Sequence, residues 1–281
     1  MLSYQHGYHA GNFADVIKHF TLVRLLHYLT QKEKPFVYLE THAGSGMYDL
    51  NDKQAQKTGE WTTGIDVLWK KKASMPKLLS SYINAVSTIN TTNSLRYYPG
   101  SPSIATQLLR FQDRFVFCER HPTEFKNLTE LPHGNARGIY HEGDGWAQMR
   151  ATLPPKERRG LIFIDPSYEL KTEYRLLPEQ LKLAYKRFET GIYCIWYPLV
   201  DKKLNERFQQ DLLNIGVKSF LKVEFNREPP FRAPGMMGCG LWIINPPYVL
   251  EQELTETLAV LCKLINPGKS SFRIETGGRR V

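Results

Sequence analysis

The sequence predicts an α/β fold, a Rossmann-like sandwich with a mostly parallel sheet and a small inserted helical subdomain. Short apolar runs, which are typical of buried strands, alternate with helical patterns along most of the chain. Such alternation is typical of a parallel sheet that carries helices on both faces. Residues 50–110 interrupt it with helical patterns and little strand signal, which indicates an insertion. The length of 281 residues fits one domain of this kind.

The first predicted elements are a helix and a strand. Residues 12–30 carry apolar side chains at spacings of three and four, so we expect an amphipathic helix. Residues 36–39 form a short apolar run, as buried parallel strands do. The run ends at Glu40, which opens a turn that contains two glycines.

The predicted insertion, residues 50–110, divides the main domain into a first part, residues 1–49, and a remainder, residues 111–267. Near the end of the insertion, Ser101 is followed by Pro102. Serine is a favoured N-cap residue and proline suits the first helical position, so we expect a helix to start here.

The remainder of the main domain continues the alternation. Apolar runs predict strands at residues 115–118, 138–141, 161–164, 191–197, 219–223 and 241–244. Helical spacing lies between most of these runs. The polar and glycine-rich end, residues 268–281, is expected to be a loose tail.

Charge and composition restrict the class of partner and the compartment. The net charge is +9, from 37 Lys and Arg against 28 Asp and Glu, and such an excess favours polyanionic partners such as nucleic acid. No apolar stretch approaches the roughly 18 residues of a membrane span, and the N-terminus lacks the regions of a signal peptide. Cys118, Cys194, Cys239 and Cys262 form no Cys-x-x-Cys pair. We therefore expect a cytoplasmic protein with free thiols and no membrane contact.

Polar residues directly follow several predicted strands. Ligands of open α/β sheets bind beyond the carboxyl ends of the strands, so these residues should converge on one crevice. Gly44 and Gly46 follow the first strand and permit a close approach of ligand to backbone. Their loop resembles the acidic-x-x-x-Gly-x-Gly loop of methyltransferases that bind S-adenosylmethionine. A tight strand-to-helix turn without a ligand explains the same residues.

Acidic residues end the next two strands. Glu119 ends the second strand and can accept hydrogen bonds from two ribose hydroxyls, although a solvated residue or an ion pair is the alternative. Asp144, followed by Gly145, comes after the third strand. It can accept a hydrogen bond from the adenine amine of a cofactor, or it can belong to an ordinary turn.

Asp165 ends the fourth strand and opens the segment Asp165-Pro166-Ser167-Tyr168. The segment resembles the Asp/Asn-Pro-Pro-Tyr/Phe motif of methyltransferases that modify planar amino groups. An adenine amine is a poor nucleophile because its lone pair is delocalised into the ring. A carboxylate and a backbone carbonyl can accept its hydrogens and withdraw positive charge as the methyl group transfers. The ring of Tyr168 can stack on the target base.

The motif at Asp165 departs from the pattern at one position, and a second segment competes with it. Ser167 replaces the second proline, which loosens the turn and adds an N–H, and we expect activity to survive. Residues 245–248, Asn-Pro-Pro-Tyr, match the motif better. They follow the last strand rather than the fourth, so we expect a structural role for them.

The N-terminal region contains His6, His9 and His19, with Lys18 beside the last. Nothing brings these residues together as metal ligands, so we expect no metal site. Lys18 and His19 could face the methionine carboxylate of the cofactor, and the helix start at Ser101 is another candidate. For each of them, an ordinary surface residue is the alternative.

Several segments together resemble one family. They are residues 2–19 (Leu-Ser-Tyr-x-His-x-x-His-Ala-Gly-Asn-x-Ala-Asp-Val-x-Lys-His), 41–46 (Thr-His-Ala-Gly-x-Gly), 96–102 (Arg-Tyr-Tyr-Pro-Gly-Ser-Pro) and 158–166 (Arg-Arg-Gly-Leu-Ile-x-Ile-Asp-Pro). The combination resembles the bacterial RlmJ family of large-subunit ribosomal RNA adenine-N6 methyltransferases. The similarity extends over nearly the whole chain.

The resemblance implies a Rossmann-like fold that binds S-adenosylmethionine and no metal, with Asp165 as the catalytic acceptor. The family's cofactor-contacting positions fall on His19, His42, Ser101, Glu119, Asp144, Gly145 and Asp165. The N-terminal segment that meets the substrate adenine would include Tyr4, His6 and Lys18.

The resemblance further implies 23S ribosomal RNA as the partner. A target base must leave its stack to enter a pocket, which costs least where the RNA is unpaired. We therefore expect naked RNA or an early assembly as substrate, and no obligate protein partner. The alternatives are a DNA adenine-N6 or protein glutamine methyltransferase, and a non-catalytic RNA protein that binds S-adenosylmethionine and has lost activity through Ser167.

Overall fold

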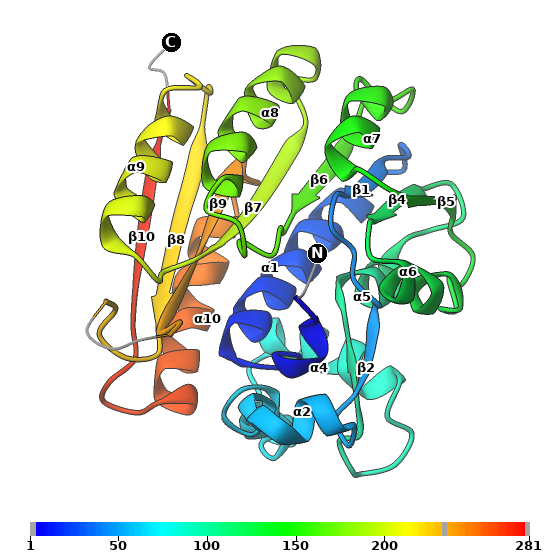
Figure 1. Cartoon of the computed structure of the whole chain (residues 1–281). Coiled ribbons are helices and arrows are strands. Elements are labelled where there is room, and N and C mark those ends of the chain that lie inside the picture. Colours follow the sequence, from blue (N-terminus) through cyan, green and yellow to red (C-terminus); the bar gives the residue numbers. More distant parts are fainter. Residues whose placement is uncertain (1–3, 232–234, 279–281) are drawn as a thin grey trace.

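The structure, a computed structural model, describes residues 4–231 and 235–278. A sheet of eight strands in the order β10-β8-β9-β7-β6-β1-β4-β5 runs through the molecule, and helices cover both of its faces (Figure 1). This is the α/β sandwich that the alternating pattern predicts. Leu2 and Ser3 of the opening motif and residues 279–281 of the predicted tail lie outside the described residues.

The parallel half of the sheet determines where the site lies. The strands are β1 (Val37–Glu40), β2 (Met47–Asp49), β3 (Tyr97–Pro99), β4 (Arg114–Glu119), β5 (Arg137–Glu142), β6 (Gly160–Ile164), β7 (Ile192–Pro198), β8 (Phe220–Asn226), β9 (Gly238–Ile244) and β10 (Ser271–Gly277). Strands β5, β4, β1, β6 and β7 are parallel, whereas β9, β8 and β10 pair antiparallel. The carboxyl ends of β1, β4, β5 and β6 therefore meet at one edge of the sheet.

Helices form a layer on each face of the sheet. They are α1 (Phe13–Thr30), α2 (Lys53–Thr58), α3 (Ile65–Trp69), α4 (Lys77–Thr88), α5 (Ser101–Leu108), α6 (Pro122–Thr129), α7 (Gly145–Thr152), α8 (Glu173–Arg187), α9 (Lys202–Leu213) and α10 (Leu250–Ile265), with short 3-10 turns η1 (His6–Tyr8), η2 (Glu60–Thr63) and η3 (Lys72–Ser74). Helices α1, α4, α5 and α10 share one core with the sheet, and α7, α8 and α9 share the other. Because α1 contacts α4, α5, α10 and β9, residues 13–23 are all buried. The sequence-based prediction of an amphipathic helix is therefore wrong, because α1 is buried on all sides over this stretch.

The predicted insertion corresponds to the segment between β2 and β3. Residues 50–96 contain α2, α3, α4 and the turns η2 and η3, and the β2–β3 ribbon connects them to the main domain. Helix α5 was expected within the insertion (50–110), but it packs against α1 in the main layer. We therefore propose the narrower bounds 50–96 for the inserted segment.

Two local predictions are wrong. Residues 271–277 do not belong to a loose tail, because they form β10 and pair with β8 along its whole length, with Phe272 and Ile274 packed on the core. Ser101 is the first residue of α5 and not its N-cap, which is Gly100. The Ser101 hydroxyl donates to Glu40 inside the protein. The helix nevertheless starts where the sequence predicts.

The cysteines agree with the prediction of free thiols. Cys118, Cys194, Cys239 and Cys262 are all free, and the first three are buried. Burial raises the pKa of the Cys118 and Cys239 thiols to about 12, so they stay protonated. Within the described part of the chain, every helix is too short or too polar to cross a bilayer.

Candidate active site

A cavity of about 880 Å³ lies at the carboxyl edge of the parallel strands. The residues named from the sequence that line it are Tyr4, His6, His9, Lys18, His19, His42, Gly44, Ser101, Glu119, Asp144, Gly145, Asp165, Pro166, Ser167 and Tyr168. The structure therefore brings together the strand ends that the sequence places at one crevice. Among the described residues, no group of three or more His, Cys, Asp or Glu is arranged to hold a metal ion.

The glycine loop after β1 forms part of the cavity wall. Gly44 and Gly46 have φ values of 64° and 73°, which side-chain-bearing residues rarely adopt. The N–H of Gly44 donates to Oε2 of Glu119 at 2.8 Å, and the N–H of Gly100 donates to the carbonyl of Gly46 at 2.8 Å. The loop is thereby attached both to the end of β4 and to the start of α5.

Glu119 is oriented by backbone donors at the end of β4. Its Oε1 accepts a hydrogen bond from the N–H of His121 at 2.7 Å, while Oε2 accepts from Gly44. Burial raises the pKa of this carboxyl above its ordinary value. Each carboxylate oxygen can accept a second hydrogen bond, so the group is able to receive a pair of hydroxyl donors.

Asp144 and Gly145 join the start of α7 to the end of β1. Oδ1 of Asp144 accepts from the N–H of Trp146 at 2.9 Å and caps the helix. A Cβ on residue 145 would lie 2.0 Å from the carbonyl oxygen of Thr41, so only glycine permits this close approach. The ring of His42 lies 5.1 Å from that of Trp146. The two loops therefore form one continuous wall.

Glu40 lies beneath this wall and is not among the residues that line the cavity. The carboxyl is fully buried, and its two oxygens accept the hydroxyls of Ser101 and, at 3.0 Å, Tyr38. Burial raises the pKa of Glu40 to about 8. Glu40 thus positions Ser101 at the cavity wall without reaching the cavity itself.

Two histidines of the wall are neutral. Nδ1 of His19 lies 2.7 Å from the hydroxyl of Tyr98, and burial lowers the pKa of His19 to about 3. Burial lowers the pKa of His42 to about 4. Neither ring therefore offers a positive charge to a cofactor carboxylate near pH 7, although both can hydrogen bond.

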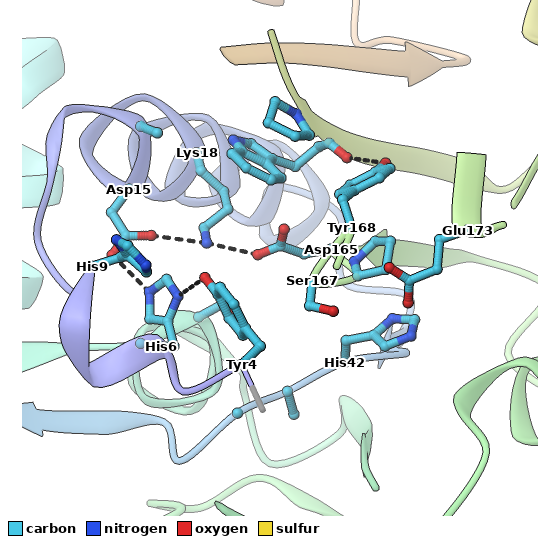
Figure 2. A pocket seen from close by; sticks show the side chains of 18 of the residues that line it. Tyr4, His6, His9, Asp15, Lys18, His42, Asp165, Ser167, Tyr168 and Glu173 are labelled. Carbon is cyan, nitrogen blue, oxygen red and sulfur yellow. Dashed lines mark hydrogen bonds and ion pairs between the residues drawn. The ribbon is translucent and has the colours of Figure 1, made fainter. Parts of the chain in front are cut away.

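A chain of hydrogen bonds connects the N-terminal segment with Asp165 (Figure 2). Nζ of Lys18 lies 2.6 Å from Oδ2 of Asp165 and 2.9 Å from Oδ1 of Asp15. Nε2 of His6 lies 2.9 Å from Oδ2 of Asp15, and Nδ1 lies 2.8 Å from the Tyr4 hydroxyl. The network links the first residues of the chain to the end of β6.

The partners of Lys18 differ from those that the sequence predicts. Burial opposes the charge on Lys18, but Asp15 and Asp165 outweigh it and raise its pKa, so the side chain is an ammonium. That charge is shared between two carboxylates, so it does not face a cofactor carboxylate. Since Lys18 contacts Oδ2, Oδ1 of Asp165 can accept a hydrogen bond from another donor.

Tyr168 is not the open stacking surface that the sequence predicts. Its φ of 54° lies in the left-handed region, and its side chain is only 9% exposed. The hydroxyl donates to the carbonyl of Trp196 at 2.6 Å, and the ring centroid lies 4.6 Å from that of Tyr174. The ring borders the cavity as part of its wall.

Sequence reasoning missed Asp15, Glu60 and Trp196, which all line the cavity. Asp15 precedes Lys18 by three residues, a helical spacing that signals a pair on one face. Glu60 lies 3.0 Å from Nδ1 of His9, a contact between segments that no local pattern encodes. Trp196 lies within the apolar run of β7, where nothing distinguishes it from core residues.

The competing Asn-Pro-Pro-Tyr segment lies at the opposite edge of the sheet, because β9 runs antiparallel to β7. Nδ2 of Asn245 donates to the carbonyls of Glu189 and Gly191, each at 2.7 Å. Tyr248 is 88% exposed. Residues 245–248 do not line the cavity, and the contacts of Asn245 agree with the structural role that we expect for them.

The sheet order and the residues at its carboxyl edge define a Rossmann-like methyltransferase. The model of the family described as "Ribosomal RNA large subunit methyltransferase D, RlmJ" matches residues 33–276. The chain belongs to this family, as the sequence motifs predict.

Individual relatives agree with this assignment. The Ribosomal RNA large subunit methyltransferase J of Escherichia coli is 43% identical over 269 residues, 95% of this chain and 96% of its own. The protein of that name from Haemophilus influenzae is 42% identical over 277 residues, 98% of each chain. A crystal structure of a Legionella pneumophila protein is 50% identical, with a TM-score of 0.91 over 96% of this chain and 98% of the other.

Proposed function

We propose that this chain transfers a methyl group from S-adenosylmethionine to the exocyclic N6 of an adenine in 23S ribosomal RNA. Membership of the family supports methyl transfer to large-subunit RNA. The placement of Asp165 is the observation that supports an amine as the methyl acceptor. This residue follows β6 and lines the cavity, and Lys18 contacts only one of its two carboxylate oxygens. A carboxylate so placed accepts a hydrogen bond from a planar amine.

The wall formed by the glycine loop fits S-adenosylmethionine. Glu119 would accept the ribose hydroxyls, Asp144 the adenine amine of the cofactor, and Ser101 at the start of α5 would face the methionine carboxylate. Gly145, His19 and His42 complete this wall. The cavity of about 880 Å³ is near the top of the roughly 300–1,000 Å³ typical of ligand pockets, which suits a site for a cofactor and a base.

Asp165 would perform the central chemical task. S-adenosylmethionine, when bound, supplies a methyl group on a positively charged sulfonium. Oδ1 of Asp165 and the carbonyl of Pro166 would accept the two amine hydrogens, which favours a more tetrahedral nitrogen. As the nitrogen–methyl bond forms and the sulfonium–methyl bond breaks, these acceptors would withdraw positive charge from the nitrogen, and the proton that the nitrogen releases would pass through Asp165 to solvent. Lys18, bonded to Oδ2, would hold the carboxyl group in place and direct Oδ1 toward the amine.

The N-terminal segment would contact the target base. Figure 2 shows Tyr4 beside the space in front of Asp165, with its hydroxyl bonded to His6. We assign Tyr4, together with His6, Lys18 and the wall residue Tyr168, to the binding of the substrate adenine. An aromatic contact of this kind contributes about 1–3 kcal/mol.

The substrate would be naked or early-assembly RNA in the cytoplasm. The experiment offers the purified protein and labelled S-adenosylmethionine four acceptors: naked 23S RNA, mature large subunits, adenine-containing DNA and a glutamine-containing protein. We expect labelled N6-methyladenine in the naked RNA alone. Equal labelling of mature subunits would contradict the early substrate, and preference for DNA or protein would contradict the RNA assignment.

A further inference from the structure

Positive charge is distributed unevenly around the cavity. The inserted segment, residues 50–96, contains seven Lys and Arg against three acids, so +4 of the net charge of +9 lies in 47 residues. Residues 119–144, which follow β4 and line the other side of the cavity with Glu119, Glu124 and Asp144, contain five acids against three Lys and Arg. A polyanion at the cavity therefore meets attraction on one side and repulsion on the other.

Helix α2 of the inserted segment lies against the N-terminal segment that presents Tyr4 (Figure 1). Nε2 of Gln54 donates to Oε1 of Gln5 at 2.6 Å, and the hydroxyl of Thr58 donates to the carbonyl of Tyr8. In the turn that follows α2, Glu60 and Thr63 line the cavity. Helix α2 therefore borders the rim of the cavity on the Tyr4 side.

Two lysines on α2 are free to meet an anion. Lys53 and Lys57 are one helical turn apart, so their side chains share a face of the helix, and both are exposed. Nζ of Lys57 lies 5.7 Å from the ring centroid of Tyr8, within the N-terminal segment. Neither ammonium forms an ion pair with any carboxylate in the described ranges. This contrasts with Lys70 of the same segment, which pairs with Asp66 at 2.6 Å.

We propose that Lys53 and Lys57 of α2 bind phosphates of the RNA strand that flanks the target adenine. The inference rests on the proposed function, which places the adenine between Tyr4 and Asp165. A base inserted there leaves its sugar and phosphates at the rim, where α2 is basic and the opposite side is acidic. Contacts to phosphate position the strand and carry no sequence information. The two lysines should therefore bind RNA equally well whatever the sequence that flanks the target adenine.

The test compares the double variant Lys53→Gln/Lys57→Gln with the matched control Lys182→Gln/Lys186→Gln. The control pair is also exposed and one turn apart, but it lies in the second half of α8, which runs away from the cavity. The logarithm of the association constant for a 23S RNA fragment falls linearly with the logarithm of the salt concentration. We expect this dependence to be shallower in the α2 variant, by about 0.7–0.9 for each lysine removed. The RNA KM should rise, while kcat at saturating RNA and cofactor affinity stay at wild-type values.

A wild-type salt slope in the α2 variant, or an equal decrease in the control, would overturn the inference. Wild-type enzyme that methylates no RNA at all would instead contradict the proposed function, so the two failures are distinguishable. Thermal unfolding of each variant verifies that the fold is retained. A second RNA fragment of unrelated sequence should lose affinity in parallel, because the proposed contacts are to phosphate.

Discussion

At the scale of single residues, the position of Lys18 explains why Asp165 presents one particular oxygen to the cavity as a hydrogen-bond acceptor. The ammonium is 4% exposed and lies between Asp15 and Asp165. Removing one partner of such a buried group costs about 3–5 kcal/mol because a charge is left uncompensated. The contact with Oδ2 therefore leaves Oδ1 as the oxygen that Asp165 offers to another donor.

Glu40 carries a prediction about pH. Its pKa is raised by burial to about 8, so the folded protein holds a proton that the unfolded chain loses near its ordinary value of 4.5. Stability from this group is present below pH 4.5 and is lost as pH rises to about 8. Glu40→Gln, which does not titrate, should be more stable than wild type at pH 9 by a few kcal/mol and equal to it near pH 4.5. Urea unfolding at both pH values measures the gap, and a gap that does not widen with pH would refute this account.

Ser167 carries a prediction about activity. Ser167 does not share the left-handed φ of its neighbour Tyr168, so we expect the second proline of the motif to fit at this position. Ser167→Pro should leave kcat unchanged and raise the free energy of unfolding by about 0.4–1 kcal/mol, because the unfolded chain has fewer conformations. Steady-state kinetics and urea unfolding test both effects. An inactive wild type that gains activity with proline would favour the non-catalytic alternative.

Individual site residues could be predicted from the sequence where their role depends only on a position at the carboxyl end of a strand. Glu119 ends a parallel strand, and Asp144 and Asp165 closely follow two others. The topology of such sheets brings these strand ends together. Side-chain partners were not predictable in this way. The contact of Lys18 with Asp165 depends on how α1 crosses the sheet, and the burial of Tyr168 depends on a left-handed φ that the sequence does not indicate.

At the scale of elements, side-chain contacts from the inserted segment hold the N-terminal segment that carries Tyr4 and His9 in place. Oε2 of Glu60 accepts from Nδ2 of Asn12 at 2.9 Å, and Oε1 contacts His9. The ring of His9 in turn stacks on Tyr4, with centroids 5.8 Å apart and planes 15° from parallel. The sequence predicted the insertion as a helical unit, but not this contact, because it joins residues about fifty positions apart.

Glu60→Gln should weaken this support. A hydrogen bond with Glu60 raises the pKa of His9, so stabilisation by the pair is present below pH 6.5 and is lost as pH rises through the folded value. Both side chains are over a third exposed, so we expect a loss of about 0.2–1 kcal/mol, with a higher RNA KM that differs most from wild type at acidic pH. Kinetics from pH 6 to 8 measure this.

Asp66→Asn is the matched control for Glu60→Gln. It removes one negative charge from the same inserted segment, but Asp66 pairs with Lys70 and does not line the cavity. An equal change in KM in both variants would show that overall charge, and not the position of His9, is responsible.

At the scale of the whole molecule, a parallel half-sheet builds the site and an antiparallel half extends the core. The parallel half was predictable, since strands alternate with helices there. The antiparallel pairing of β8, β9 and β10 was not, because apolar runs do not encode strand direction. The strand β10 was missed because its polar and glycine-rich composition hides the alternating Phe272 and Ile274.

The buried histidines predict how the whole fold responds to acid. The pKa values of His19 and His42 are lowered by burial to about 3 and about 4, whereas the unfolded chain protonates near 6.5. Stability from both groups is present above pH 6.5 and is lost as pH falls toward 4, by up to about 1.4 kcal/mol per pH unit for each. Glu40 acts in the opposite direction over this range, so the test compares wild type with His42→Gln at each pH. The unfolding free energy of wild type should fall relative to that of His42→Gln between pH 7 and 5. A dependence on pH that this variant leaves unchanged would be inconsistent with a neutral buried ring.

The most direct measurement is methyl transfer from labelled S-adenosylmethionine to purified large-subunit RNA by three proteins: wild type, Asp165→Ala and Asn245→Ala. The two variants truncate the first residue of the two competing motifs, which lie at opposite edges of the sheet. We expect labelled N6-methyladenine with wild type and Asn245→Ala, and a loss of about 10²–10⁴-fold in rate with Asp165→Ala, which still binds the cofactor. Transfer that persists in Asp165→Ala and disappears in Asn245→Ala would contradict the assignment of Asp165 as the catalytic acceptor.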